Sequence, residues 1–306
     1  MPSKKLTSIC FTSKFVHTAC IKTIFDNTEV KALIVSGPDL NPLPFLTDCI
    51  DYALKHNIPV YPNKDITGSD ILRISQETDV GISVGFGSVI RRKQFTGPTF
   101  GTFNLHPSKL PAYRGMHPII YGMMNGEPTL GITLHKIDSG IDTGPIISQS
   151  TELVTPHDSV RSMTDKLYTK GAELIDQLLH TLTEKGYVPE VNQSMYDDLL
   201  GARRVIHWND SAWRINNLVR SLSYPWPMAK TFFKSTPILI GRSDIIHDNE
   251  MIPGLILDIC PDYIKVGTGG HSITISEIRD ENKNIIPIPK FRELFNPIPM
   301  QSRFED

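Results

Sequence analysis

Two polar side chains close an apolar run in the segment TFNLHPSKLPAYRG, which begins at Thr102. Asn104 and His106 are two positions apart, and side chains at that spacing on a strand point to the same face. Pro107 then ends the strand, because proline has no N–H to donate to a neighbouring strand. In an open parallel sheet, ligands bind at the carboxyl ends of the strands. An amide and an imidazole at such an end can act together on one atom of a ligand.

A carboxylate follows in the segment HKIDSGIDTGPI, where Asp142 is flanked by Gly140 and Gly144. Glycines let the backbone of a loop approach a ligand closely. If this loop folds over the strand end, Asp142 joins Asn104 and His106. A carboxylate beside an imidazole can orient the ring, raise its pKa and accept a proton. These residue types therefore indicate general acid–base chemistry.

Alternating strands and helices in the first half predict the fold that positions these residues. We expect a doubly wound α/β domain with a mostly parallel sheet, because repeated strand–helix–strand units imply right-handed crossovers. A 3.6-residue apolar period between Thr155 and Gly186 predicts a long covering helix. The predicted strands are 8–12, 30–36, 80–86 and 99–105, and the predicted helices are 17–26, 45–56 and 69–77.

The second half has a different pattern, which predicts a small β-barrel. One helix is expected over 211–222, and the tail over 286–299 is spaced by prolines and expected to be extended. We place the catalytic domain at 1–190, a linker at 191–204 and the barrel at 205–306. Short strands are predicted at 231–233, 238–240, 254–259, 263–266 and 272–278.

The composition is that of an enzyme in a reducing compartment. Lys and Arg total 31 against 33 Asp and Glu, so no overall charge attracts nucleic acid or an anionic membrane. Cys10, Cys20, Cys49 and Cys260 lack paired spacing, which argues against disulfides, a zinc site or another metal centre. No apolar run is long enough for a membrane span or a signal peptide. We expect a cytoplasmic protein and leave its oligomeric state open, with a homodimer as one option.

The segment FNLHPSKLPAYRGMHPIIYGMMNGEPTLGITLHKIDSGIDTG, which begins at Phe103, resembles the signature of the 10-formyltetrahydrofolate-dependent formyltransferase superfamily. Its Asn-x-His, Leu-Pro-x-x-Arg-Gly and Asp-x-Gly elements match in order and spacing. IHWNDSAWRINNLVRSLSYPWPMA and PGLILDICPDYIKVGTGG resemble the C-terminal part of the same proteins. The resemblance implies a Rossmann-like domain followed by an OB-like barrel, as in methionyl-tRNA formyltransferases and the formyltransferases of nucleotide-linked amino sugars. One departure is CFTSKF after the first strand, where many relatives have a glycine.

The resemblance implies transfer of a formyl group from 10-formyltetrahydrofolate to a primary amine, with Asn104, His106 and Asp142 as the catalytic set. An unprotonated amine attacks the formyl carbon, an oxyanion forms, and N10 of the folate leaves. Asn104 and His106 can donate hydrogen bonds to the oxyanion, while Asp142 orients the imidazole and takes up the proton lost by the amine. His117 and His135 are interpreted as helix-start and strand residues and receive no role.

The resemblance also implies two binding regions. The acceptor is expected at Ser108, Tyr113, Arg114 and Gly115, where a guanidinium can bind a phosphate or a carboxylate. A folate pterin needs an apolar slot edged by backbone groups. The residues expected to form that slot are Phe86, Gly87, Val89, Ile90, Ile137, Asp138 and Gly140.

The charge pattern guides the choice of acceptor. Enzymes that act on tRNA are expected to carry basic surface for its phosphates. Here residues 37–54 contain no Lys or Arg, and residues 205–306 contain 11 Lys and Arg against 12 Asp and Glu. The main prediction is therefore a nucleotide-linked amino sugar, with initiator methionyl-tRNA as the alternative. A folate- or RNA-binding module without turnover is a third interpretation, and the complete set of three polar residues argues against it.

Overall fold

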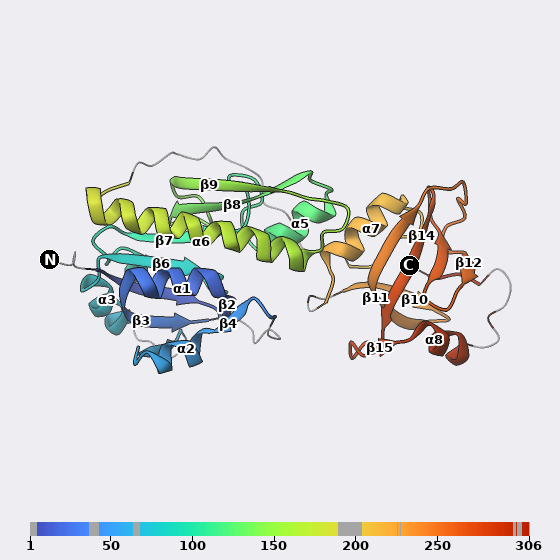
Figure 1. Ribbon diagram of the computed structural model, residues 1–306, viewed down its shortest axis with the longest axis horizontal. Coiled ribbons are helices and arrows are strands. Elements are labelled where there is room, and N and C mark those ends of the chain that lie inside the picture. Colours follow the sequence, from blue (N-terminus) through green and yellow to red (C-terminus); the bar gives the residue numbers. More distant parts are fainter. Residues whose placement is uncertain are drawn as a thin grey trace. The chain divides into compact units, whose positions relative to one another are not determined.

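The β-branched runs of the first half form a seven-stranded sheet (Figure 1). The structure, a computed structural model, describes residues 5–36, 43–63, 68–188, 204–224, 226, 228–295, 298 and 302–305. The strand order is β5-β3-β1-β6-β7-β8-β9; the first five strands run parallel, and β8 is antiparallel to both of its neighbours, β7 and β9. The strands are β1 Leu6–Thr12, β3 Thr28–Val35, β5 Val60–Pro62, β6 Val80–Val84, β7 Thr102–His106, β8 Thr129–Lys136 and β9 Ile146–Leu153.

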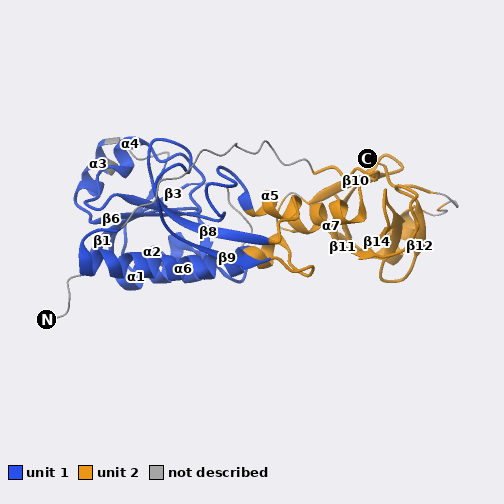
Figure 2. Cartoon of the chain, turned by 90° about the horizontal axis from the view of Figure 1, so that it is seen from above, with its two compact units in different colours: residues 1–118, 129–153, 164–199 blue, residues 119–128, 154–163, 200–306 orange. Residues whose placement is uncertain are grey.

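Helices cover both faces of this sheet, which confirms the doubly wound prediction. Figure 2 shows α3 and α4 on one side and α1, α2 and α6 on the other. Ile9 and Phe11 of β1 pack with Ile74 of α3, and the Cys20 thiol of α1 donates to the Tyr168 carbonyl of α6 over 3.2 Å. No helix in the described part of the chain is long and apolar enough to cross a bilayer. The helices are α1 Thr18–Asn27, α2 Cys49–Lys55, α3 Gly68–Gln76, α4 Arg92–Phe95, α5 Pro118–Met124 and α6 Val160–Lys185.

The predicted helix over 45–56 is only partly correct. Strand β4, Leu46–Asp48, occupies its first part and pairs with β2, Phe15–His17, in an antiparallel ribbon. Helix α2 begins at Cys49 because the Asp48 carboxylate accepts hydrogen bonds from two N–H groups of the first turn and caps the helix. The antiparallel hairpin of β8 and β9 is also absent from the sequence prediction.

The chain divides into two compact units, which Figure 2 colours separately. The predicted boundaries at 190 and 205 stay predictions, because only Arg204 of the linker over 191–204 lies among the described residues. Helix α5 from Ile119 onward and the first turn of α6 belong to the second unit. Unit 1 comprises Met1–Pro118, Thr129–Leu153 and Thr164–Leu199, and unit 2 comprises Ile119–Pro128, Val154–Met163 and Leu200–Asp306.

The second unit contains the expected β-rich domain, an antiparallel six-stranded sheet in the order β10-β11-β14-β13-β12 with β15 beside β14. Its core includes Trp208, Phe233, Phe291 and Phe304, which are almost completely buried. Helix α7, Ala212–Ser221, agrees with the predicted helix over 211–222. The strands are β10 Ala229–Phe233, β11 Thr236–Ile246, β12 Ile256–Ile259, β13 Ile264–Gly267, β14 Ser272–Arg279 and β15 Ile285–Ile286.

The prediction of an extended tail over 286–299 is wrong for its central part. Helix α8, Ile288–Leu294, forms there, with Pro287 as its N-cap. Proline is tolerated in the first turn of a helix because the N–H groups there have no intrahelical partner. Ile288 and Phe291, three positions apart, are buried on one side of this helix. The proline spacing therefore marks a helix start.

Candidate active site

Asn104 and His106 lie where the sequence places them, at the carboxyl end of β7. The next strand, β8, runs antiparallel to β7, and it sets His135 directly opposite Asn104. Directly opposed residues of two strands share one face of the sheet. The loop after β8 then brings Asp142 to the same place, so the predicted convergence of amide, imidazole and carboxylate is present in the structure.

The carboxylate of Asp142 is the centre of this cluster. Its Oδ2 accepts a hydrogen bond from the N–H of Gly115 over 3.0 Å and lies 3.4 Å from Nδ1 of His106. Its Oδ1 accepts from Nδ2 of Asn104 over 3.3 Å and lies 3.4 Å from Nε2 of His135. Asp142 has a φ of +50°, a left-handed conformation that non-glycine residues adopt at a cost. The surrounding contacts hold the residue in that conformation.

The environment fixes Asp142 as an anion. Burial of the carboxyl group by itself would raise its pKa. The imidazoles of His135 and His106 and the N–H of Gly115 act in the opposite direction, and together they lower the pKa of Asp142 to about 2. A carboxylate this acidic remains charged at neutral pH.

His106 is held as a neutral ring that can take up a proton. Burial lowers the pKa of His106, although Asp142 and the carbonyl of Tyr113 favour the protonated form. Nε2 lies 2.8 Å from the carbonyl oxygen of Tyr113, which can only accept, so Nε2 carries the hydrogen. In the neutral ring the lone pair is then on Nδ1, which faces Asp142. A proton that arrives on Nδ1 is stabilised by the carboxylate beside it.

The sequence of the whole chain places this cluster in a known family. A family model described as formyl transferase matches residues 69–179, and one described as formyl transferase, C-terminal domain, matches residues 201–296. A methionyl-tRNA formyltransferase of Trichlorobacter lovleyi is 32% identical over 273 residues, which are 85% of this chain and 84% of that protein. The chain belongs to the formyl transferase family. A methionyl-tRNA formyltransferase of Thermodesulfovibrio yellowstonii is 35% identical over 221 residues, 71% of this chain and 70% of that protein.

Solved structures of other formyl transferases have the same fold. An N-formyltransferase from Helicobacter canadensis, solved with folinic acid and dTDP-3-aminofucose, superposes with a TM-score of 0.65. The match covers 89% of this chain and 99% of that chain at 20% sequence identity. At this identity the likeness supports the architecture of both domains.

His135 is the member of the formyl transferase cluster that the sequence analysis passed over. Its side chain is 3% exposed, and its Nε2 lies 3.2 Å from Nδ2 of Asn104. The prediction that His135 is a strand residue is correct, but the residue also contacts two members of the expected catalytic set. The signal that would reveal it is the pairing of β8 with β7, because only the register brings His135 opposite Asn104.

The residues predicted to bind the acceptor are close together in the chain segment that follows β7. The N–H of Gly115 binds Asp142 and the carbonyl of Tyr113 binds His106, so this segment also orients the cluster. Ser108 is buried, and its hydroxyl donates to the carbonyl of Ala112. That contact gives Ser108 a role within the turn, and acceptor binding by the four predicted residues stays a prediction.

The residues predicted to bind folate differ in their surroundings. Phe86 and Ile90 pack against the core that surrounds Phe11, whereas Val89 is 77% exposed. Asp138 accepts hydrogen bonds from the N–H of Gly140 and the hydroxyl of Thr143 within the β8–β9 loop, which also contains Ile137. Gly87, like Val89, is exposed. Gly87 and Val89 therefore lie on the surface, Phe86 and Ile90 contribute to the core, and folate binding by the predicted residues stays a prediction.

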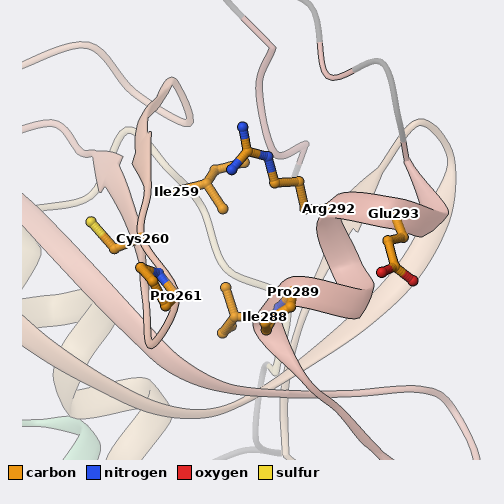
Figure 3. Close-up of a pocket in the computed structure, with 7 residues that line it drawn as sticks. All are labelled: Ile259, Cys260, Pro261, Ile288, Pro289, Arg292 and Glu293. Atoms are coloured by element: carbon orange, nitrogen blue, oxygen red, sulfur yellow. The ribbon is translucent and has the colours of Figure 1, made fainter.

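A pocket in the second unit lacks the features of this cluster (Figure 3). Its charged groups are one guanidinium and one carboxylate, and no imidazole lines it. We therefore place the candidate active site of the formyl transferase in the first unit. The pocket is lined by Ile259, Cys260, Pro261, Ile288, Pro289, Arg292 and Glu293.

Replacement of Gly144 by alanine is expected to disturb the loop that carries Asp142. The added methyl carbon would lie 1.8 Å from the carbonyl oxygen of Lys136, so the loop must shift. We expect kcat to fall by about tenfold, since small displacements of reacting groups are costly. Gly270→Ala is the matched control, because no atom lies within 4 Å of the added carbon there. Equal kcat values for the two variants would contradict this expectation.

Proposed function

We propose that this formyl transferase moves the formyl group of 10-formyltetrahydrofolate onto the α-amino group of methionyl-tRNA. The observation that carries the proposal is the similarity to methionyl-tRNA formyltransferases across both domains, at 32% identity over 84% of the length of one such protein. A likeness confined to the catalytic domain would support formyl transfer alone. The similarity therefore favours the tRNA acceptor over the amino sugar that the charge pattern predicts.

The amino sugar remains the second candidate because of two observations. The fold is shared with an N-formyltransferase solved with dTDP-3-aminofucose, although 20% identity supports only the architecture. The near balance of 11 basic and 12 acidic residues over 205–306 also fits a small acceptor better than a nucleic acid. An experiment must therefore compare methionyl-tRNA with nucleotide-linked amino sugars as acceptors.

The chemistry that we propose uses the cluster around Asp142. The amine attacks the formyl carbon, the carbonyl oxygen becomes an oxyanion, and the bond between that carbon and N10 of the folate then breaks. The amine gives up one proton, which Nδ1 of His106 takes up beside the Asp142 carboxylate. Asn104 donates a hydrogen bond to the oxyanion. The proton on His106 passes to N10 as the folate leaves, so the ring returns to its neutral form.

The folate is proposed to lie against the exposed residues Gly87 and Val89 and the loop that contains Asp138 and Gly140. This position would bring N10 to the strand end that carries His106. A similar folate ligand, folinic acid, is present in the Helicobacter canadensis structure of the same fold. In this proposal the residues that bind folate lie next to the catalytic cluster.

The acceptor is tested by offering the purified protein radiolabelled 10-formyltetrahydrofolate with each candidate amine. We expect label to appear on initiator methionyl-tRNA and none on a panel of nucleotide-linked amino sugars. Methionyl-tRNA with an acetylated amino group is the control, since it presents the same phosphates without a free amine. Label on the sugars and none on the tRNA would overturn the proposed acceptor, while formyl transfer itself would stand.

The salt dependence of acceptor binding provides an independent prediction. Each phosphate contact adds about −0.7 to −0.9 to the slope of log K against log salt. A sugar nucleotide offers about two phosphates, so its slope should be no steeper than about −2. For methionyl-tRNA we expect a slope steeper than about −3, measured by filter binding between roughly 50 and 200 mM salt. A shallow slope for the tRNA would contradict recognition through several phosphates.

A further inference from the structure

We propose that His135 is a positioning residue for the formyl transfer reaction. In this proposal the ring donates a hydrogen bond from Nδ1 and holds the amide of Asn104 with its N–H edge toward Asp142. The idea rests on the role proposed above for Asn104, and it adds a residue that acts through that amide. Two observations support it: the contacts of the two ring nitrogens, and the position of His135 opposite Asn104 on the neighbouring strand.

The first step concerns the tautomer of His135. Nδ1 lies 3.0 Å from the carbonyl oxygen of Lys136, which has no hydrogen to give. Nδ1 must therefore be the donor, and in the neutral ring Nε2 has the lone pair. Nε2 can then accept from Nδ2 of Asn104, at a separation of 3.2 Å. The backbone of β8 thus determines which nitrogen of the ring faces the amide.

The second step concerns the orientation of the amide. Nδ2 of Asn104 carries two hydrogens, and its two acceptors are Oδ1 of Asp142 and Nε2 of His135. If the amide turned over, its carbonyl oxygen would face a carboxylate and a lone pair, and both contacts would be repulsive. Because Asp142 is anionic and His135 presents a lone pair, only one orientation of Asn104 is favourable.

The third step links this orientation to catalysis. The two hydrogen bonds from Nδ2 measure 3.3 and 3.2 Å, at the long end of the normal range. An oxyanion binds an N–H group more strongly than a neutral nitrogen does, and it can replace His135 as the acceptor. His135 therefore keeps one N–H of Asn104 oriented and available before the oxyanion forms. Preorganised donors of this kind need no rearrangement during the reaction.

Three replacements of His135 separate this role from simple packing. His135→Leu removes both nitrogens, and we expect kcat to fall about tenfold while KM for 10-formyltetrahydrofolate stays within about twofold. His135→Gln can place its side-chain oxygen near the former Nε2 and should recover most of the loss. His135→Asn reaches only as far as the former Nδ1 and should recover none. Thermal melts identify any variant whose loss comes from unfolding.

A double-mutant cycle gives the decisive comparison. If His135 acts through Asn104, adding His135→Leu to Asn104→Ala should cause no further loss of kcat. A further loss of about tenfold in that background, or equal activity of the Gln and Asn variants, would overturn the proposal. If Asn104→Ala keeps normal turnover, both the proposal and the role of Asn104 fail. The assay uses methionyl-tRNA, or the amino-sugar nucleotide if that is the amine that the wild-type protein formylates.

An NMR readout keeps the test independent of the acceptor. In protein labelled with ¹⁵N in histidine, the two ring nitrogens of a neutral imidazole have different shifts that identify the tautomer. We expect His135 as the Nδ1–H tautomer in the wild type, and a changed Nε2 shift in Asn104→Ala. An Nε2–H tautomer in the wild type would contradict the proposal even if the acceptor assignment is correct. Conversely, failure to formylate methionyl-tRNA would overturn the acceptor and leave this measurement valid.

Discussion

Asp142→Asn is expected to lower kcat by about 10²-fold or more, the usual contribution of a positioned acid–base group. The replacement keeps the shape of the side chain, and asparagine tolerates the left-handed backbone at this position. It removes the negative charge that stabilises a proton on Nδ1 of His106, 3.4 Å away. The new side-chain amide of residue 142 also points its own N–H hydrogens at one of the groups that now donate to Asp142, and this contact is unfavourable. The measurement is kcat at saturating 10-formyltetrahydrofolate, together with a thermal melt.

The matched control for this variant is Asp158→Asn. The Asp158 carboxylate is also buried and accepts hydrogen bonds from Thr155 and Ser162, but it belongs to the second unit. We expect this change to lower the melting temperature and to leave kcat within about twofold. If the two variants lost activity equally, loss of a buried carboxylate as such would explain the result, and the role of Asp142 would be wrong.

His106→Ala is expected to lower kcat by about 10²-fold as well and to change the dependence of the rate on pH. In the proposed mechanism the active ring is neutral, because Nδ1 must accept the proton of the amine. Since burial lowers the pKa of His106, the rate of the wild type should rise with pH through a midpoint below about 6.5 and then level off. His106→Ala should lack that acidic step.

The amine of the acceptor also titrates, so the comparison must separate the two groups. Its contribution is common to the wild type and to His106→Ala, and the difference between their profiles therefore belongs to the ring. An acidic step that persists unchanged in the variant would assign it to the amine and contradict the role of Nδ1. Combining His106→Ala with Asp142→Asn should give little additional loss, because residues that act as a unit are not additive.

Local patterns in the sequence indicate three of the four clustered side chains, and the resemblance to the formyltransferase superfamily selects these three as the catalytic set. Asn104 and His106 follow from the period of a strand and from the proline that ends it, and Asp142 follows from a loop with two glycines. These are features of consecutive residues. The alternation of strands and helices also predicted the covered parallel sheet, because crossovers of that length leave few other topologies.

The parts that the sequence could not predict depend on contacts between distant residues. His135 is recognisable only when β8 is known to pair antiparallel with β7 in the register that sets it opposite Asn104. Phe86, a residue predicted for the folate slot, packs edge-to-face on Phe11, and this contact also joins residues that are distant in the sequence. The sequence pattern does not reveal helix α8, because proline favours both an extended segment and a helix start, and only the burial of Phe291 distinguishes them.

The pairing of β7 with β8 has a consequence for how members of this family can diverge. The separation between Asn104 and His135 is set by the hydrogen-bond spacing of two adjacent strands, so it does not depend on the length of any loop. Insertions between the strands can therefore accumulate without altering this amide–imidazole pair. Asp142 has no such protection, because its position depends on the length of the loop between β8 and β9. Changes in the surface that selects the amine are therefore tolerated more freely than changes in the length of the seven-residue stretch between the end of β8 and Gly144.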